Sequence, residues 1–149
     1  MKIDANEYMV FDANKKIVGR FASVIAKNLL NGKTVAVINA EKALISGNKN
    51  DLMKKYRTRL NIKETMNPEN SPYWSKKPDI LMKRIIRGML PYKSSHGKEA
   101  YKRLKVFISV PEIFKDKSCV EMVSKDTKTM YMNTMSIKEL SELLGYKEQ

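Results

Sequence analysis

Apolar positions over the first forty residues alternate between strand spacing and helical spacing. Residues 8–11 are a short apolar run closed by an Asp-Ala-Asn turn, which predicts a strand. From residue 19 to 30 apolar side chains recur at helical spacing before an Asn-Gly pair, which predicts a helix with a left-handed stop. Residues 34–38 are β-branched and apolar throughout, as in a strand covered on both faces. This order predicts a βαβ unit with parallel strands and a right-handed crossover.

The next segment predicts a helix and then a long irregular stretch. After the Ser-Gly-Asn turn at residues 46–48, apolar and basic residues alternate with helical spacing to about Leu60. This spacing turns Leu52 and Tyr56 inward and most of the lysines and arginines outward. Residues 62–77 contain two prolines and the single tryptophan, and a loop of this length in a compact domain usually has a function or packs as its own unit.

A second basic helix and a break follow. Pro78 suits the first position of a helix. The residues expected on its buried stripe are Leu81, Ile85 and Met89. We expect Gly88 to end this helix where a side chain would be strained, and Pro91 to prevent its continuation. A polar turn containing His96 then leads to a short basic helix and an apolar strand at residues 106–110. Two cationic helix ends are thereby held close together, a clamp suited to a phosphate backbone.

The last forty residues differ in character from the rest. Ser136 and Glu139 have the spacing of a capping box, and Gly145 suits a C-terminal cap. The sequence therefore predicts a short helix over residues 137–144. Its apolar side chains require a surface on the main body or on a partner protein.

The charge is concentrated in the middle of the chain. The formal net charge is +13, and residues 49–105 hold 16 Lys and Arg against 5 Asp and Glu. Residues 106–149 hold 6 against 7. A basic region so poor in acidic residues predicts a surface that binds a polyanion, and we favour nucleic acid over a membrane because no basic amphipathic helix carries aromatic anchors. No apolar run is long enough to span a bilayer, so we expect no membrane partner.

Catalytic chemistry has little support in the sequence. His96 and Cys119 are the only residues of their types and lie far apart, and the spacing for a metal site or a glycine-rich phosphate loop is missing. We therefore expect no enzyme activity, no metal, no cofactor and no small-molecule substrate. A single cysteine also excludes an internal disulfide and fits a reducing cytosol.

Cations beside turn glycines and prolines are the best candidates for phosphate contacts, because exposed backbone N–H groups assist them. Gly47, Gly88 and Pro91 are the turn residues concerned. Tyr73, Trp74 and Tyr92 could stack on unpaired bases, although Trp74 could equally pack within its own loop.

Several motifs together resemble the large-subunit ribosomal protein L-thirteen family. They are Val10-Phe11-Asp12-Ala13, Val18-Gly19-Arg20-Phe21-Ala22-Ser23, Val37-Ile38-Asn39-Ala40-Glu41-Lys42, Ser46-Gly47-Asn48-Lys49, Arg87-Gly88-Met89-Leu90-Pro91 and Lys102-Arg103-Leu104-Lys105-Val106. The resemblance covers roughly residues 8–110, and the tail is similar to the archaeal and eukaryotic form.

The resemblance implies a three-layer α/β/α fold with a short, mostly parallel sheet and a C-terminal extension ending in a short helix. We expect residues 1–110 to form an α/β RNA-binding core and residues 111–149 an extension packed on that core or on a partner. It further implies a cytoplasmic structural protein of the large ribosomal subunit, with large-subunit ribosomal RNA and neighbouring ribosomal proteins as partners. The residues expected to contact RNA are Arg20, Lys49, Lys54, Lys55, Arg57, Arg59, Lys76, Lys77, Arg84, Arg87, Lys93, Lys98, Lys102, Arg103 and Lys105.

Two other classes of function stay open at this stage. An RNA-modifying or nucleotide-using α/β enzyme would need a pocket at the carboxyl ends of the strands, lined by Asp12, Asn39 or Glu41. A free regulatory RNA-binding protein would use the same basic face outside the ribosome.

Overall fold

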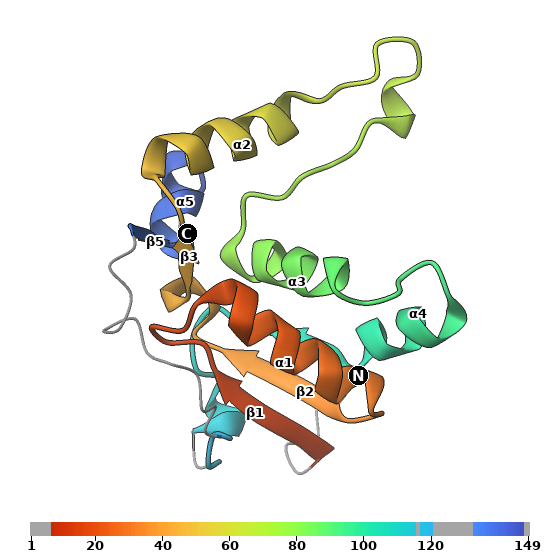
Figure 1. Cartoon of the computed structure of the whole chain (residues 1–149), viewed down its shortest axis with the longest axis vertical. Helices are drawn as coiled ribbons and strands as arrows, with labels where there is room; N and C mark the ends of the chain where they lie inside the picture. The colour runs from red at the N-terminus through yellow and green to blue at the C-terminus, as the bar shows by residue number, and fades with distance from the viewer. Residues whose placement is uncertain (1–6, 116, 121–132, 148–149) are drawn as a thin grey trace.

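Two parallel strands joined by a helix form the first part of the fold, as the sequence predicts. The computed structural model describes residues 7–115, 117–120 and 133–147. Strand β1 (Tyr8–Asp12), helix α1 (Val18–Leu30) and strand β2 (Thr34–Ile38) follow one another, and β1 pairs with β2 in parallel with Val10 opposite Ala36. The predicted βαβ unit is confirmed (Figure 1).

The third strand lies earlier in the chain than predicted. Strand β4 (Leu104–Val106) pairs in parallel with β2, giving the sheet order β1-β2-β4. A further strand in this sheet is confirmed, but its predicted bounds of residues 106–110 were wrong, since only Val106 of that range lies in β4. The Phe107 N–H still donates a hydrogen bond to the Val37 carbonyl of β2, at 2.8 Å. Its ring packs against Phe114, with ring centroids 5.8 Å apart, and the chain turns away from the sheet there.

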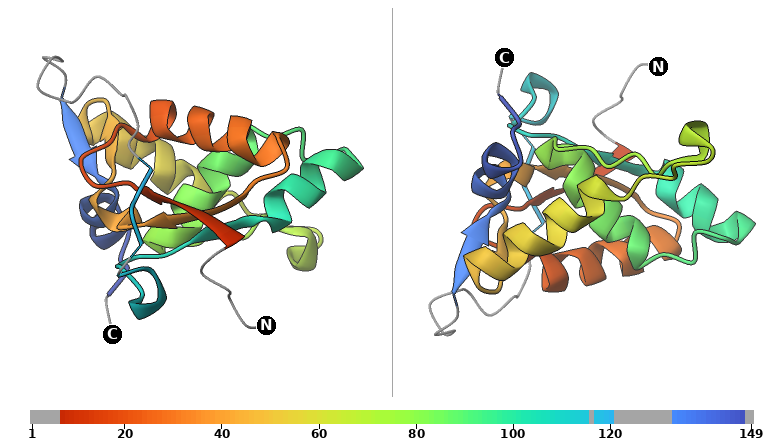
Figure 2. Two further views of the ribbon diagram at one scale, coloured as in Figure 1. Left: turned by 90° about the horizontal axis from the view of Figure 1, so that it is seen from below. Right: turned by 90° about the horizontal axis from the view of Figure 1, so that it is seen from above.

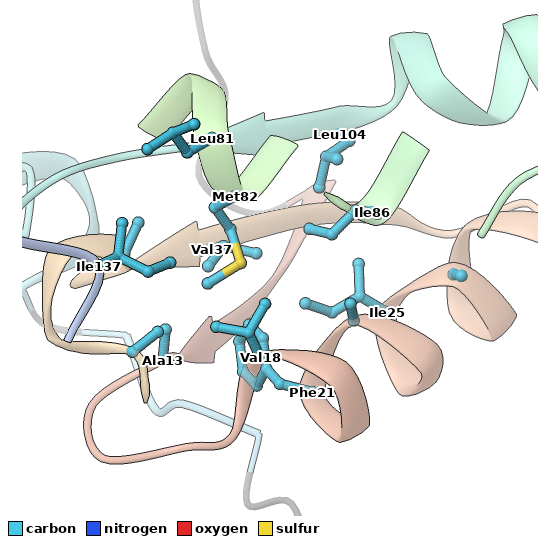
Figure 3. Close-up of a cluster of buried hydrophobic side chains, with 14 of the residues drawn as sticks. Ala13, Val18, Phe21, Ile25, Val37, Leu81, Met82, Ile86, Leu104 and Ile137 are labelled. Atoms are coloured by element: carbon cyan, nitrogen blue, oxygen red, sulfur yellow. The ribbon is translucent and has the colours of Figure 1, made fainter. Parts of the chain in front are cut away.

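Helices cover one face of this sheet. Helix α3 (Pro78–Gly88) packs against α1, and helix α4 (Ser95–Lys102) also contacts α1. Side chains from α1, α3 and β2 meet in the main core, where Figure 3 shows Ile25, Met82 and Val37 together.

The buried stripe of α3 differs in phase from the prediction. Leu81 is buried as expected, but Met82 and Ile86 are the other fully covered side chains. Ile85 is only half-buried, and Met89 lies beyond the last turn of the helix with 41% of its surface exposed. At about 100° per residue, Leu81, Met82 and Ile86 span about 140° of the helix, a wider stripe than the roughly 80° of the predicted set. Packing against α1, and not periodicity alone, therefore decides which residues of α3 are buried.

The opposite face of the sheet is covered by a different kind of structure. Val10, Ala36 and Ile38 form a smaller core with Phe114, which comes from the 3₁₀ turn η4 (Glu112–Phe114). The sheet is therefore sandwiched between helices and the segment that follows β4. The predicted α/β class, with a mostly parallel sheet and a short C-terminal helix, is confirmed.

Helix α2 (Lys49–Asn61) lies farther from the sheet than α3 does (Figure 1). Asn48 caps its start, since the Asn48 side chain accepts a hydrogen bond from the Asn50 N–H, and the preceding Gly47 has a φ of 137°. Residues 62–77, which we call the arm, return from α2 to α3 with only the short 3₁₀ turn η3 (Pro68–Asn70) in them. The predicted long irregular segment is confirmed.

The C-terminal elements join the rest of the molecule at the end opposite α4, as both views in Figure 2 show. Strand β3 (Leu44–Ser46), which follows the 3₁₀ turn η2 (Ala40–Lys42), pairs antiparallel with β5 (Thr134–Ser136). Helix α5 (Ile137–Leu143) follows directly.

The predicted capped helix is confirmed. The Ser136 side chain accepts a hydrogen bond from the Glu139 N–H, and Gly145 has a φ of 87°. Ile137 and Leu140 are fully buried in the same core as α1 and α3. The division of the chain at residue 110 into two domains stays a prediction. Among the described residues, no helix is both long enough and apolar enough to cross a bilayer.

Candidate nucleic-acid interface

The basic helices α2 and α3 face one another across a pocket of about 540 Å³. Lys55 and Arg59 reach it from α2, and Arg84 and Arg87 reach it from α3. No aspartate or glutamate lines this pocket, which we call the α2–α3 cleft. Four cations from two helices thus converge where no described acidic side chain neutralises them, an arrangement that favours an anionic ligand.

Trp74 of the arm contacts two of the four cations of the cleft. The Arg84 guanidinium carbon is 4.5 Å from the centre of the Trp74 ring, and that of Arg59 is 5.1 Å away. Arg84 also donates a hydrogen bond to the Tyr73 carbonyl. Each arginine is attracted by the ring's negative face, so the stack joins α2, the arm and α3. Of the two roles considered for Trp74, packing within the protein is the one its surroundings support.

A second aromatic stack continues along α3 toward α4. Arg87 lies 5.0 Å from the Tyr92 ring, which packs edge-on against Tyr101 with centroids 5.3 Å apart. Lys83 lies 5.1 Å from the Tyr101 ring. Burial lowers the pKa of Lys83, and the nearby Lys105 lowers it further. Sequence reasoning missed both Lys83 and Tyr101, although Lys83 lies one turn before Arg87 and could have been found from that spacing.

The turn between α3 and α4 is built differently from the prediction. Gly88 is the last residue of α3, its φ is not positive, and a Cβ there would meet nothing within 4 Å. The expected strain at Gly88 is therefore wrong. The close approach is at Gly97, where a Cβ would lie 2.0 Å from the Pro91 carbonyl oxygen.

Ser94 holds this turn together. Its hydroxyl donates to the Pro91 carbonyl at 2.8 Å and accepts from the Gly97 N–H at 3.2 Å, so it caps α4. His96 consequently lies in the first turn of α4, exposed to solvent, and not in a polar turn before it. The sequence suggests Gly97 as a turn glycine beside Lys98, but it lies within α4. Its close approach to Pro91 is not predictable, because the spacing of one glycine does not reveal which distant backbone it touches.

Most of the predicted RNA-binding residues outside the cleft are exposed on the surface. These are Arg20, Lys54, Arg57, Lys76, Lys77, Lys93, Lys98 and Lys102. Lys49 is also exposed, but its ammonium lies 2.6 Å from Glu139 of α5 and so has an acidic partner. Gly47 forms the turn before α2, as predicted.

Arg103 and Lys105 lie apart from the α2–α3 cleft. Arg103 is half-buried, and its guanidinium donates to the Leu29 carbonyl at 3.0 Å, near the end of α1. A cation at a helix C-terminus is stabilising, which gives Arg103 a role in the fold. Lys105 is half-buried within β4.

Two of the three residues considered for an enzyme site, Asp12 and Asn39, are hydrogen-bonded to each other. One Asp12 carboxylate oxygen accepts from the Asn39 amide at 2.9 Å and from the Asn14 N–H at 3.0 Å. These bonds join the ends of β1 and β2. Desolvation raises the pKa of the Cys119 thiol and Asp12 raises it further, whereas a nucleophilic cysteine needs a lowered pKa. Among the described residues, no three His, Cys, Asp or Glu side chains are grouped to hold a metal ion.

Comparison with known proteins finds similarity to one family of ribosomal proteins. A family model described as "Ribosomal protein L13" matches residues 6–112. The protein named "Large ribosomal subunit protein uL13" from Methanosarcina barkeri is 41% identical over 93% of this chain and 98% of its own length. Its namesakes from Archaeoglobus fulgidus and Methanopyrus kandleri are 38% and 36% identical, over 99% and 97% of this chain and 94% and 91% of their own lengths.

Proposed function

This chain belongs to the ribosomal protein L13 family, and from that premise we propose that the α2–α3 cleft is its main contact with large-subunit ribosomal RNA. The protein is a structural constituent of the large ribosomal subunit and not an enzyme. A free regulatory role and an enzymatic role are not favoured by this kinship.

The chemistry of the cleft suits phosphate groups. Arginine presents its N–H donors in one plane, and those donors match the oxygens of a phosphate. The guanidinium groups of Arg59 and Arg84 lie over the Trp74 ring, and Arg84 gives one of its donors to the Tyr73 carbonyl. An arginine carries five N–H donors, so each group has donors left for a ligand. Lys55 adds a mobile point charge on the α2 side. The stack therefore holds two guanidinium groups at fixed places before RNA arrives, which lowers the entropy lost on binding.

A second contact surface extends from the cleft along the turn after α3. Lys93, Lys98 and Lys102 are exposed on that turn and on α4. We assign the RNA-contacting role to these lysines and to the exposed cations of α2, and a structural role to Arg103. We further propose that the protein contacts neighbouring ribosomal proteins and is located in the cytoplasm, within the large subunit. We propose no membrane partner and no small-molecule substrate.

One observation carries the proposal: four cations from two separate helices line one cleft that no acidic residue lines. The test is sucrose-gradient sedimentation of extract containing the tagged full-length chain. We expect a stoichiometric peak with the large subunit, and reduced occupancy for the double variant Lys55→Gln, Arg87→Gln. Lys27→Gln with Lys33→Gln, which removes two exposed lysines outside the cleft, is the matched control. A chain that stays at the top of the gradient would contradict the ribosomal role, and equal occupancy for both double variants would contradict the role of the cleft.

A further inference from the structure

A second groove lies on the other side of Trp74, under the arm. Its residues come from the end of α2, the arm, the start of α3 and the segment after α5. They are Leu60, Ile62, Lys63, Pro68, Ser71, Pro72, Tyr73, Trp74, Ser75, Lys76, Lys77, Ile80 and Tyr146. We call it the arm groove. Most of its side chains are apolar or aromatic, and several stay open to solvent: Tyr73 is 81% exposed and Ile62 is 50% exposed.

Tyr73 and its neighbour Trp74 have different surroundings. Trp74 contacts Arg59 of α2 and Arg84 of α3, whereas the side chain of Tyr73 is left largely open to solvent. The two sides of the arm are joined by Ser71, whose hydroxyl accepts from the Glu64 N–H at 2.9 Å. The groove is therefore built by contacts within the protein and does not depend on a ligand to form.

The charged groups at the arm groove all have one sign. Lys63, Lys76 and Lys77 line it, and all three are exposed. No acidic residue lines it, since Glu64 and Glu69 of the arm lie outside its lining. An apolar floor with a cationic edge complements a ligand that is flat and apolar on one part and anionic on another.

We propose that the arm groove binds an unpaired nucleotide of RNA, with the base stacked on Tyr73 and the adjoining phosphates at the three lysines. Stacking on an exposed aromatic ring beside a cationic track is how proteins bind single-stranded RNA. An apolar protein segment would satisfy the floor of the groove but would leave the lysines without partners. The inference rests on the proposed RNA-binding function and assigns it a second site for single-stranded RNA, distinct from the α2–α3 cleft.

Fluorescence of the full-length chain reports binding, because Trp74 is the only tryptophan. Trp74 lines the α2–α3 cleft as well as the arm groove, so the Tyr73 variants decide whether the signal comes from the groove. The probe is a single-stranded adenosine oligonucleotide of about eight residues, within the site size of such proteins. We expect binding to change Trp74 emission. Tyr73→Ala should weaken affinity for the probe about fivefold to a hundredfold, as loss of base stacking does elsewhere. Tyr73→Phe should retain the affinity, and Met66→Ala, an exposed arm residue outside the groove, should leave it unchanged.

The lysines give an independent measurement. Changing Lys63, Lys76 and Lys77 together to glutamine should make the salt dependence of probe binding shallower by about 0.7 for each lysine removed. Wild-type probe affinity in Tyr73→Ala, with normal binding to structured ribosomal RNA, would overturn the arm-groove proposal and leave the α2–α3 cleft standing. Tyr73→Ala could instead bind the probe normally and be incorporated less into large subunits. That result would also overturn the proposal, because the occupant of the groove would then be a protein segment. Loss of ribosomal RNA binding in Lys55→Gln, Arg87→Gln alone bears on the cleft and not on the groove.

Discussion

At the scale of single residues, close contacts in this protein depend on chain segments that meet only after folding. The helix break near Pro91 is visible in the sequence, but the residue that cannot carry a side chain is Gly97, against the Pro91 carbonyl. Gly88 has the better sequence argument, since it ends a helix, yet open space surrounds it. Propensity rules describe the local chain, whereas the packing of one turn on another is a tertiary property.

Two glycine substitutions test this contrast. Gly97→Ala should lower the free energy of unfolding by about 1–3 kcal/mol, because its Cβ would overlap backbone that cannot move aside. Gly88→Ala should leave that free energy unchanged or raise it by about 0.4–1 kcal/mol, since alanine loses less chain entropy in a helix. Urea denaturation measures both. Equal destabilisation by the two changes would show that the turn has no close approach at Gly97.

Tyr56 gives a prediction about alkaline pH. It lies on the buried face of α2, and burial raises the pKa of its phenol while Arg59 lowers it, with a net rise above the usual 10.0. The folded state therefore holds this proton more tightly than the unfolded state. The stability it contributes is present below pH 10.0 and is lost as pH rises through the folded pKa. Tyr56→Phe should make the loss of stability above pH 10.0 less steep in urea denaturation at a series of pH values. Identical alkaline unfolding curves for Tyr56→Phe and wild type would rule out this contribution.

At the scale of elements, the sequence predicts both basic helices, the irregular segment between them and the outward direction of most cations. It does not predict the α2–α3 cleft, because the position of α2 depends on how the arm returns. Periodicity predicts that Arg59 and Arg84 lie on separate helices, but it does not predict that the two side chains lie close together. The arm inserts Trp74 between the two, and no rule of local spacing specifies that contact.

Removing the tryptophan should release the arm. Trp74→Ala eliminates two cation–π contacts that together contribute about 1–2 kcal/mol, so local opening should become about five- to thirtyfold more frequent. Limited trypsin digestion under native conditions reads this out as faster cleavage after Lys63 or Lys76. Tyr73→Ala, next in the chain but exposed, is the control and should digest at the wild-type rate. A Trp74→Ala chain as resistant as wild type would mean that the stack does not hold the arm.

At the scale of the whole molecule, the chain order of strands and helices gives the βαβ unit and the α/β class. The start of β4 is less accessible to sequence reasoning, because an apolar run at residues 106–110 suits a strand or a cover for the other face of the sheet. The pairing of β3 with β5 is not predictable from either segment, since each is only three residues long. Helix α5, in contrast, carries its own capping signals and is found where they place it.

The core shared with α5 makes the tail important for stability. Ile137→Ala should lower the free energy of unfolding by about 2–5 kcal/mol, as expected for a fully buried side chain. Leu143→Ala, on the same helix but 38% exposed, should cost much less. Thermal denaturation compares the two variants. A small effect of Ile137→Ala would indicate that the extension folds apart from the first 110 residues, as a separate domain would.

The central claim is that the α2–α3 cleft binds ribosomal RNA through its phosphates, and the salt dependence of binding tests it most directly. With 6–10 phosphate contacts overall, the affinity of the full-length chain for large-subunit ribosomal RNA should fall about 10³–10⁵-fold between 50 and 200 mM salt. In a filter-binding titration, Lys55→Gln with Arg87→Gln should bind more weakly and make the slope of log affinity against log salt shallower by about 1.8, while leaving the Trp74 stack intact. An unchanged slope and affinity in that variant, at an unchanged thermal midpoint, would contradict the account.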